Sequence, residues 1–159
     1  MRSSIKKELG KKLPRVKQVK VLLKGCERYL DEMFKIIEKI EEKSDDITSL
    51  HHAIEEAIEM NRGLYSDEEE ERLYLEAQET SKEIEIENNK LEKIERKINK
   101  YLNDVYGILD RPIKEKSKEE LLKKISDIKT HLGDIFSRNC LYSQEVEESM
   151  KWLEDYINE

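Results

Sequence analysis

The chain has 159 residues, of which 42% are charged and 36% hydrophobic, with only five Gly and two Pro. This length suits one domain with a modest core, and a composition rich in Glu, Lys, Leu and Ile is typical of long helices with narrow apolar stripes and wide solvated faces. No apolar run approaches the roughly 18–20 residues that span a bilayer, and residues 1–13 lack the apolar core of a secretory signal, so we expect a soluble protein.

The first predicted element follows a basic arm over residues 1–13. Pro14 is compatible with the first turn of a helix, where its missing N–H is harmless. Beyond it, apolar residues recur at alternating gaps of three and four, at Val16, Val19, Leu23, Cys26, Leu30, Met33, Ile37 and Ile40. This spacing predicts a helix of about 30 residues that ends near Lys43.

A polar break is expected at residues 44–46, which have the chemistry of a helix N-cap. A second helix then follows, with inward positions at Ile47, Leu50, Ile54, Ala57 and Ile58. Continuation of the first helix after a kink stays open as an alternative. Gly63 is a suitable stop because Gly accepts the left-handed conformation past a helix end.

The third predicted helix opens on a capping box, with Ser66 as N-cap and Glu69 three residues later. A heptad register runs from Leu73 to Ile108 and is interrupted at Thr80 and Glu87. The helix would cover roughly 40 residues, and a sustained 3.5-residue repeat predicts coiled-coil packing against another helix. Around the two interruptions it is either solvated or faces a polar layer.

The last part of the chain predicts two further helices after Pro112, which disfavours helix at the preceding residue. A second capping box over residues 117–120 opens a helix that ends near Asn139. Ser143 then caps a short last helix whose apolar stripe is Val146, Met150, Leu153 and Ile157.

These elements together predict an all-α fold, an elongated antiparallel bundle of four to five helices with coiled-coil-like packing around one long central helix. We expect a basic arm over 1–13 and a single helical-bundle domain over 14–159. Cys26 and Cys140 have no metal-type spacing and fall among predicted helical residues. They favour free thiols in a reducing compartment, and hence a cytoplasmic protein.

Motifs for catalysis are absent from the sequence, which contains neither a Gly-rich phosphate loop nor a nucleophile elbow. The one local cluster is His51, His52, Glu55 and Glu56, where each His lies one helical turn before a Glu. Imidazole and carboxylate can hold a transition metal, but no Glu precedes a histidine by three residues as a di-iron bundle requires. A solvated face with ordinary ion pairs is preferred, so we expect no enzyme, metal or cofactor.

Charge is distributed unevenly along the chain. Residues 1–24 carry one acid, Glu8, and nine basic residues, for a net charge of +8, whereas the remainder carries −15. The nine are Arg2, Lys6, Lys7, Lys11, Lys12, Arg15, Lys17, Lys20 and Lys24. This segment could bind nucleic acid phosphates, lie on an anionic membrane through residues 5–24, or pair with an acidic surface of a partner or a second copy. A solvated helix face is the fourth alternative.

Nucleic acid is the weaker partner because the segment lacks aromatic stacking platforms and the rest of the chain is acidic. A second candidate contact is Trp152 with Tyr156, which fall off the last apolar stripe. They either form an interface, where such residues are enriched, or fold over the end of the bundle.

The resulting hypothesis is a non-enzymatic protein–protein interaction module, an adaptor, structural subunit or regulator, for which a homodimer is plausible. A nucleic-acid accessory protein and a membrane-surface protein are the alternatives. The pattern is generic for helical bundles and resembles no particular family.

Overall fold

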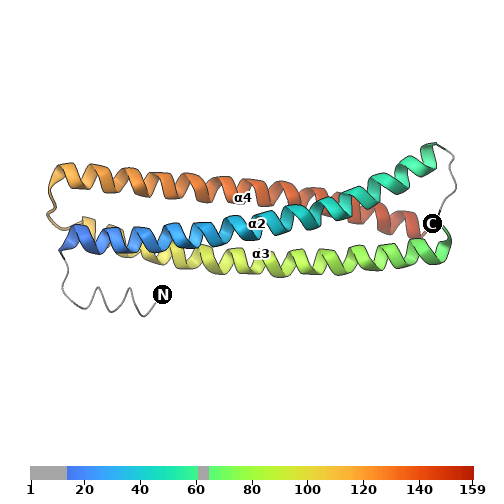
Figure 1. Ribbon diagram of the computed structural model, residues 1–159, viewed down its shortest axis with the longest axis horizontal. Helices are drawn as coiled ribbons and strands as arrows, with labels where there is room; N and C mark the ends of the chain where they lie inside the picture. The colour runs from blue at the N-terminus through green and yellow to red at the C-terminus, as the bar shows by residue number, and fades with distance from the viewer. Residues whose placement is uncertain (1–13, 61–64) are drawn as a thin grey trace. The chain divides into compact units, whose positions relative to one another are not determined.

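The computed structural model describes residues 14–60 and 65–159, and these residues form three helices. They are α2 (Arg15–Glu59), α3 (Asp67–Leu109) and α4 (Glu115–Ile157), shown in Figure 1. No strand occurs over the described ranges, so the predicted all-α class is confirmed. The arm over 1–13 and the stop at Gly63 lie outside the described residues. Within them, no helix has a stretch apolar and long enough to cross a membrane.

The predicted break at residues 44–46 is wrong, because α2 continues through it. Ser44 is fully buried and takes the inward position between Ile40 and Ile47, so the spacing of three and four is never interrupted. Ser and Asp disfavour a helix by only a fraction of a kcal/mol relative to Ala, roughly 0.5 kcal/mol each. Burial of the residues on either side outweighs that cost.

The predicted division of the last segment is also wrong, because α4 is one helix of 43 residues. It begins at Glu115, where the Lys118 N–H donates to the Lys114 carbonyl, so Ser117 is not an N-cap. Residues 134–143 contain no Gly or Pro to stop the helix. The described chain therefore has three helices where four to five were expected.

The third predicted helix is confirmed at both ends as α3. Ser66 Oγ accepts a hydrogen bond from the Glu69 N–H at 3.2 Å, as the capping box requires. The helix ends at Leu109, three residues before Pro112. It is not a uniquely long central helix, however, because it has 43 residues against 45 in α2 and 43 in α4.

Packing divides the chain into two compact units, each of which takes part of every helix. The described part of the first comprises 14–35 and 91–135 and carries 17 basic and 12 acidic side chains, a net of +5. That of the second comprises 36–60, 65–90 and 136–159 and carries 7 basic and 24 acidic side chains, a net of −17. We call them the basic unit and the acidic unit.

The basic unit has an apolar interior in which α3 runs antiparallel to α2 and α4 (Figure 1). The Cys26 thiol points at the Ile98 carbonyl, 3.9 Å away, and the rings of Tyr29 and Tyr101 are 5.6 Å apart. The inward positions of its three helical segments, spaced by three and four, are all apolar, as Val19, Leu23, Met33, Leu91, Val105, Leu121 and Ile128 illustrate. Hydrophobic burial is therefore the main stabilising term in this unit.

The acidic unit places polar residues at the same kind of inward position. Ser44, Glu87 and Ser149 are buried among Ile47, Ile54, Ile84, Val146 and Leu153. Ion pairs join its helices at the surface, between Lys43 and Glu83 and between Arg138 and Glu41. Glu87 belongs to the predicted polar layer, and its carboxylate is 3.1 Å from the Lys90 ammonium.

Candidate functional site

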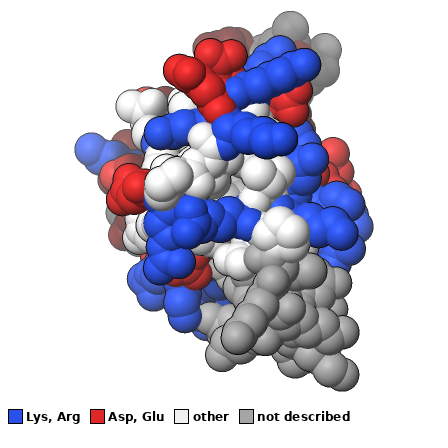
Figure 2. Space-filling model, turned by 90° about the vertical axis from the view of Figure 1, so that its left-hand side faces the viewer, with Lys and Arg blue, Asp and Glu red and all other residues white. Residues whose placement is uncertain are grey.

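Basic side chains gather where α2 begins. Arg15, Lys17, Lys20 and Lys24 are exposed there, whereas the other five residues of the predicted basic set lie outside the described residues. Arg15 Nη1 donates to the Pro112 carbonyl at 2.9 Å, which places the start of α2 against the turn between α3 and α4. Figure 2 looks onto this end and shows Lys and Arg over much of its surface.

The turn adds basic residues that the sequence interpretation missed. They are exposed, they come from the turn and the first turn of α4, and they are Arg111, Lys114, Lys116 and Lys118. Acidic neighbours such as Asp110 and Glu115 lower the net charge of this stretch, so the charge along the sequence does not mark it as basic. The fold therefore widens the predicted basic segment into a basic face of the basic unit.

Two features that the sequence kept apart meet in the acidic unit. His51 on α2 lies against Trp152 on α4, with ring centroids 4.5 Å apart. Trp152 stacks on Tyr156 at 5.3 Å and 9°, and Tyr156 Oη donates to Glu70 on α3 at 3.0 Å. Trp152 and Tyr156 are half-buried in these contacts, so much of their surface is used within the unit.

His51 has a hydrogen-bond partner at Nδ1 and a carboxylate beside Nε2. Its Nδ1 is 2.9 Å from Ser149 Oγ. Its Nε2 is 2.8 Å from Glu55 Oε2, in a geometry that makes no hydrogen bond. The His52 ring stacks on the His51 ring at 4.9 Å and 17°. The His51 side chain is only 14% exposed, so the expected solvated face does not describe it. The exposed Glu56 does not join this group.

The spacing of three and four contains the signal that would have found this contact. Continued through Ser44 and Ile47, the α2 stripe reaches His51, and continued through Asn139 and Val146, the α4 stripe reaches Ser149. Because the sequence interpretation expects breaks at 44–46 and 139–143, it starts each stripe anew and takes Leu50 and Met150 as inward in place of His51 and Ser149. His51 and Ser149 were thereby assigned to no inward face.

Two groups have pKa values that limit their chemistry. Burial raises the pKa of the Cys26 thiol from 9.0 to about 12, so this thiol is not a nucleophile near neutral pH. Burial, followed by the hydrogen bond to Glu70, raises the pKa of Tyr156 above its usual value of 10.0. The phenol is therefore a neutral donor. Neither group has the lowered pKa of an activated nucleophile.

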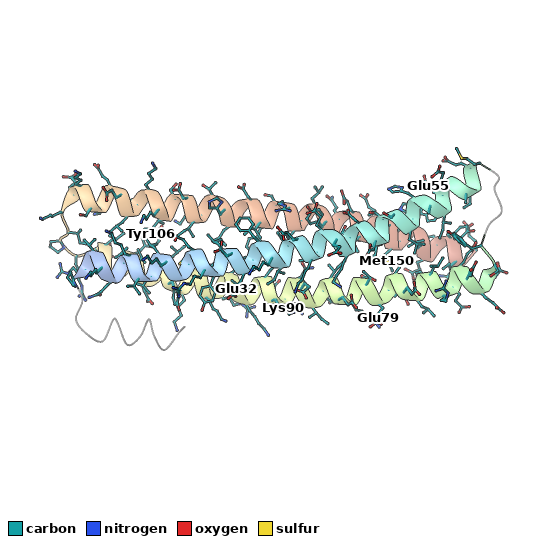
Figure 3. The ribbon with its side chains drawn as sticks, in the orientation of Figure 1. Glu32, Glu55, Glu79, Lys90, Tyr106 and Met150 are labelled. Atoms are coloured by element: carbon teal, nitrogen blue, oxygen red, sulfur yellow. The ribbon has the colours of Figure 1, made fainter. Side chains whose placement is uncertain are left out.

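A third feature is an exposed apolar line on α3 of the acidic unit. Leu75 and Ile86 are each 56% exposed and lie eleven residues apart, about three turns along the same side of the helix. Glu79 lies between them and points away from the other helices (Figure 3). A shallow groove around Leu75 is lined by acidic side chains and one basic one: Glu68, Glu71, Glu76, Glu79 and Arg72.

Exposed apolar side chains are concentrated in this unit. Of the seven large hydrophobic residues exposed in the described chain, only Leu122 belongs to the basic unit. The other six are Ile58, Met60, Tyr65, Leu75, Ile86 and Leu141. Single exposed apolar residues need no explanation, but an aligned pair within a field of carboxylates is a candidate contact surface.

Comparisons with known proteins give no family or relative for this chain. No family model matches it, and searches of curated proteins and of solved structures found no match.

Proposed function

We propose that the chain is a non-enzymatic protein–protein interaction module whose acidic unit binds a lysine-rich, partly apolar segment. The observation that carries the proposal is the line of Leu75, Glu79 and Ile86 on α3. It offers two apolar anchors within a unit of net charge −17. Anchors of this kind supply affinity, and surrounding charge selects a basic partner and accelerates encounter.

The occupant we propose is the segment of residues 1–13 of a second copy, because residues 15–24 belong to α2. That segment has five basic residues and one acid, a net charge of +4, and Ile5, Leu9 and Leu13 recur at intervals of four. Its sequence thus has both kinds of group that complement the α3 line. Pairing between chains through long heptad-patterned helices would make the module a homodimer or a subunit of a larger assembly.

A labelled peptide with the sequence of residues 1–13 tests this function. It should bind the chain lacking residues 1–13, with an affinity that falls steeply as salt rises from about 50 mM to about 200 mM, beyond which surface charges are largely screened. The double substitution L75S/I86S should weaken binding about tenfold or more, since each buried Leu or Ile anchor contributes roughly 1.5–3 kcal/mol. Leu122→Ser, in the basic unit, is the matched control and should change nothing.

Two results would contradict the proposal in different ways. Absence of peptide binding at low salt removes the acidic unit as a docking surface. The peptide could bind while the full-length chain stays monomeric at every concentration in sedimentation. The docking surface on the acidic unit would then stand, but its partner would be another basic protein.

Nucleic acid binding through the basic face is the second candidate function. The contact of Arg15 with the Pro112 carbonyl favours it, because it brings the start of α2 to the turn that carries Arg111 and Lys114. Clustered cations release counterions from a phosphate backbone, so binding of duplex DNA or RNA should weaken sharply with salt. Substituting Arg111 and Lys114 with Ser should reduce that binding, whereas L75S/I86S should not. An anionic membrane surface remains a third candidate, to be tested by co-sedimentation with vesicles containing phosphatidylserine.

A further inference from the structure

His51 has the hydrogen-bond partner and the ring contact that usually orient a metal-ligating histidine. Ser149, only 3% exposed, lies 2.9 Å from Nδ1, and its Oγ can accept a hydrogen bond from the Nδ1–H. In that tautomer the lone pair is on Nε2, which faces Glu55. A metal-ligating His ordinarily donates its other N–H to a fixed oxygen in this way, and Trp152 holds the ring from one side.

Three donor atoms converge at this point. His51, His52 and Glu55 each offer one ligand atom, and these atoms lie within 4.8 Å of one another. Ligands of one tetrahedral Zn²⁺ lie about 3.3 Å apart when each bond is about 2.0–2.1 Å long. The His51 Nε2 and Glu55 Oε2 atoms are already 2.8 Å apart, and the His52 ring and the Glu55 carboxylate, whose side chain is 43% exposed, are free to rotate toward the ion.

We propose that His51, His52 and Glu55 form a binding site for a divalent transition-metal ion of the zinc, nickel and copper group, oriented by Ser149. Two imidazole nitrogens and one carboxylate oxygen are ligands that these ions prefer over Mg²⁺ or Ca²⁺. Three protein ligands leave coordination positions for water or for a side chain of a partner. The site is independent of the docking surface proposed on α3.

The surrounding charge favours cation binding. The acidic unit has a net charge of −17, and Glu56 and Glu59 lie on the same segment of α2. Seven positive side chains belong to the described residues of this unit, and on α2 none of them lies beyond Lys43: they are Lys39, Lys43, Arg72, Lys82, Lys90, Arg138 and Lys151. A divalent ion therefore enters a field of negative sign.

Trp152 makes the site directly observable, because it is the single tryptophan of the chain and lies 4.5 Å from His51. Titration of the full chain, without a His tag, with NiCl₂ should quench its fluorescence to a plateau at one ion per chain. Addition of ZnCl₂ should then restore the fluorescence, because Zn²⁺ competes for the same ligands and does not quench.

Substitution of His52 carries the test, because this side chain is exposed and its removal leaves the interior intact. His52→Ala should weaken Ni²⁺ binding about tenfold or more, and Ser149→Ala should do so about tenfold through loss of the oriented His51. The matched control is His131→Ala, since His131 packs edge-on against Phe34 in the basic unit and should leave the titration unchanged. Circular dichroism verifies that each variant stays helical.

Equal Ni²⁺ affinity for the wild-type chain, H52A and H131A would overturn the proposal, as would quenching that never saturates. A loss of binding in H131A as large as in H52A would likewise overturn it, because the ion would then bind elsewhere.

Discussion

Ser44 and Ser149 show how the same side chain has opposite consequences at two buried positions of the acidic unit. Both occupy inward positions, and they are 0% and 3% exposed. Ser149 Oγ has His51 as its partner, whereas Ser44 Oγ has no hydrogen-bond partner within the described residues. A buried hydroxyl without a hydrogen-bond partner destabilises the fold, because it loses its bonds to water. A buried hydroxyl that bonds to a neighbouring polar group avoids this cost for both groups.

Ser44→Ala should therefore raise the free energy of unfolding by about 1 kcal/mol, from the lost desolvation cost and the better helix propensity of Ala. Ser149→Ala should lower it by about 1 kcal/mol, because His51 loses its partner. Urea denaturation followed by circular dichroism measures both. Destabilisation by Ser44→Ala would mean that its hydroxyl is satisfied in solution.

The two cysteines should differ sharply in reactivity. Cys140 is exposed, whereas Cys26 is buried with a pKa raised to about 12. At pH 8, a thiol reagent should label one cysteine per native chain and two per chain in denaturant, and Cys140→Ser should abolish native labelling. Rapid native labelling of the Cys140→Ser variant would contradict the burial of Cys26.

The same thiol links stability to alkaline pH. Because the pKa of Cys26 is raised on folding, its protonated form stabilises the folded state fully below pH 9.0, and that contribution is lost as pH rises toward about 12. Cys26→Ala should flatten this part of the stability profile relative to the unsubstituted chain.

At the scale of an element, the three helices differ in how well their ends can be predicted from sequence. The start of α3 is fixed by Ser66 and Glu69, and its end by Pro112, so local chemistry sufficed. Within α2 and α4, by contrast, residues 44–46 and 139–143 have the polar character of caps but lie inside helices. Residues with N-cap chemistry therefore begin a helix only where the pattern of buried positions is also interrupted.

Two glycines inside helices test how much local helix preference contributes to stability. Gly107 in α3 and Gly133 in α4 are exposed, and a Cβ added at either meets nothing within 4 Å. Gly107→Ala and Gly133→Ala should each raise the free energy of unfolding by about 1 kcal/mol, because Ala loses less backbone entropy in a helix. A decrease, measured by urea denaturation, would indicate that the glycine is needed for a close approach.

At the scale of the whole molecule, the two units have different interiors and different charge. The basic unit has apolar inward positions, while the acidic unit includes Ser44, Glu87 and Ser149 and a net charge of −17. Polar inward residues contribute less burial, and like charges repel within one compact body. We therefore expect local opening to cost less free energy in the acidic unit than in the basic unit.

Hydrogen exchange should detect this difference within a single helix. Amides of residues 44–58 of α2, in the acidic unit, should exchange faster than those of residues 19–33, in the basic unit, although both stretches are helical throughout. Added NaCl should reduce the difference in exchange rate between the two stretches, because it screens the repulsion among carboxylates in the acidic unit. Equal protection of the two stretches at low salt would show that the polar positions and the charge do not set local stability.

The sequence by itself determined the helical class, the capped start of α3 and the apolar stripe from Val19 to Ile40, because these depend on local chemistry and on spacing along one helix. Only the tertiary structure decided that 44–46 and 139–143 are helical, since burial against other helices overrides a weak local preference. It also decided that His51 meets Ser149 and Trp152, and that the described part of one unit has a net charge of +5 and that of the other −17. The spacing of three and four places His51 and Ser149 on inward faces, but which residue each one meets about a hundred positions away depends on how the helices pack.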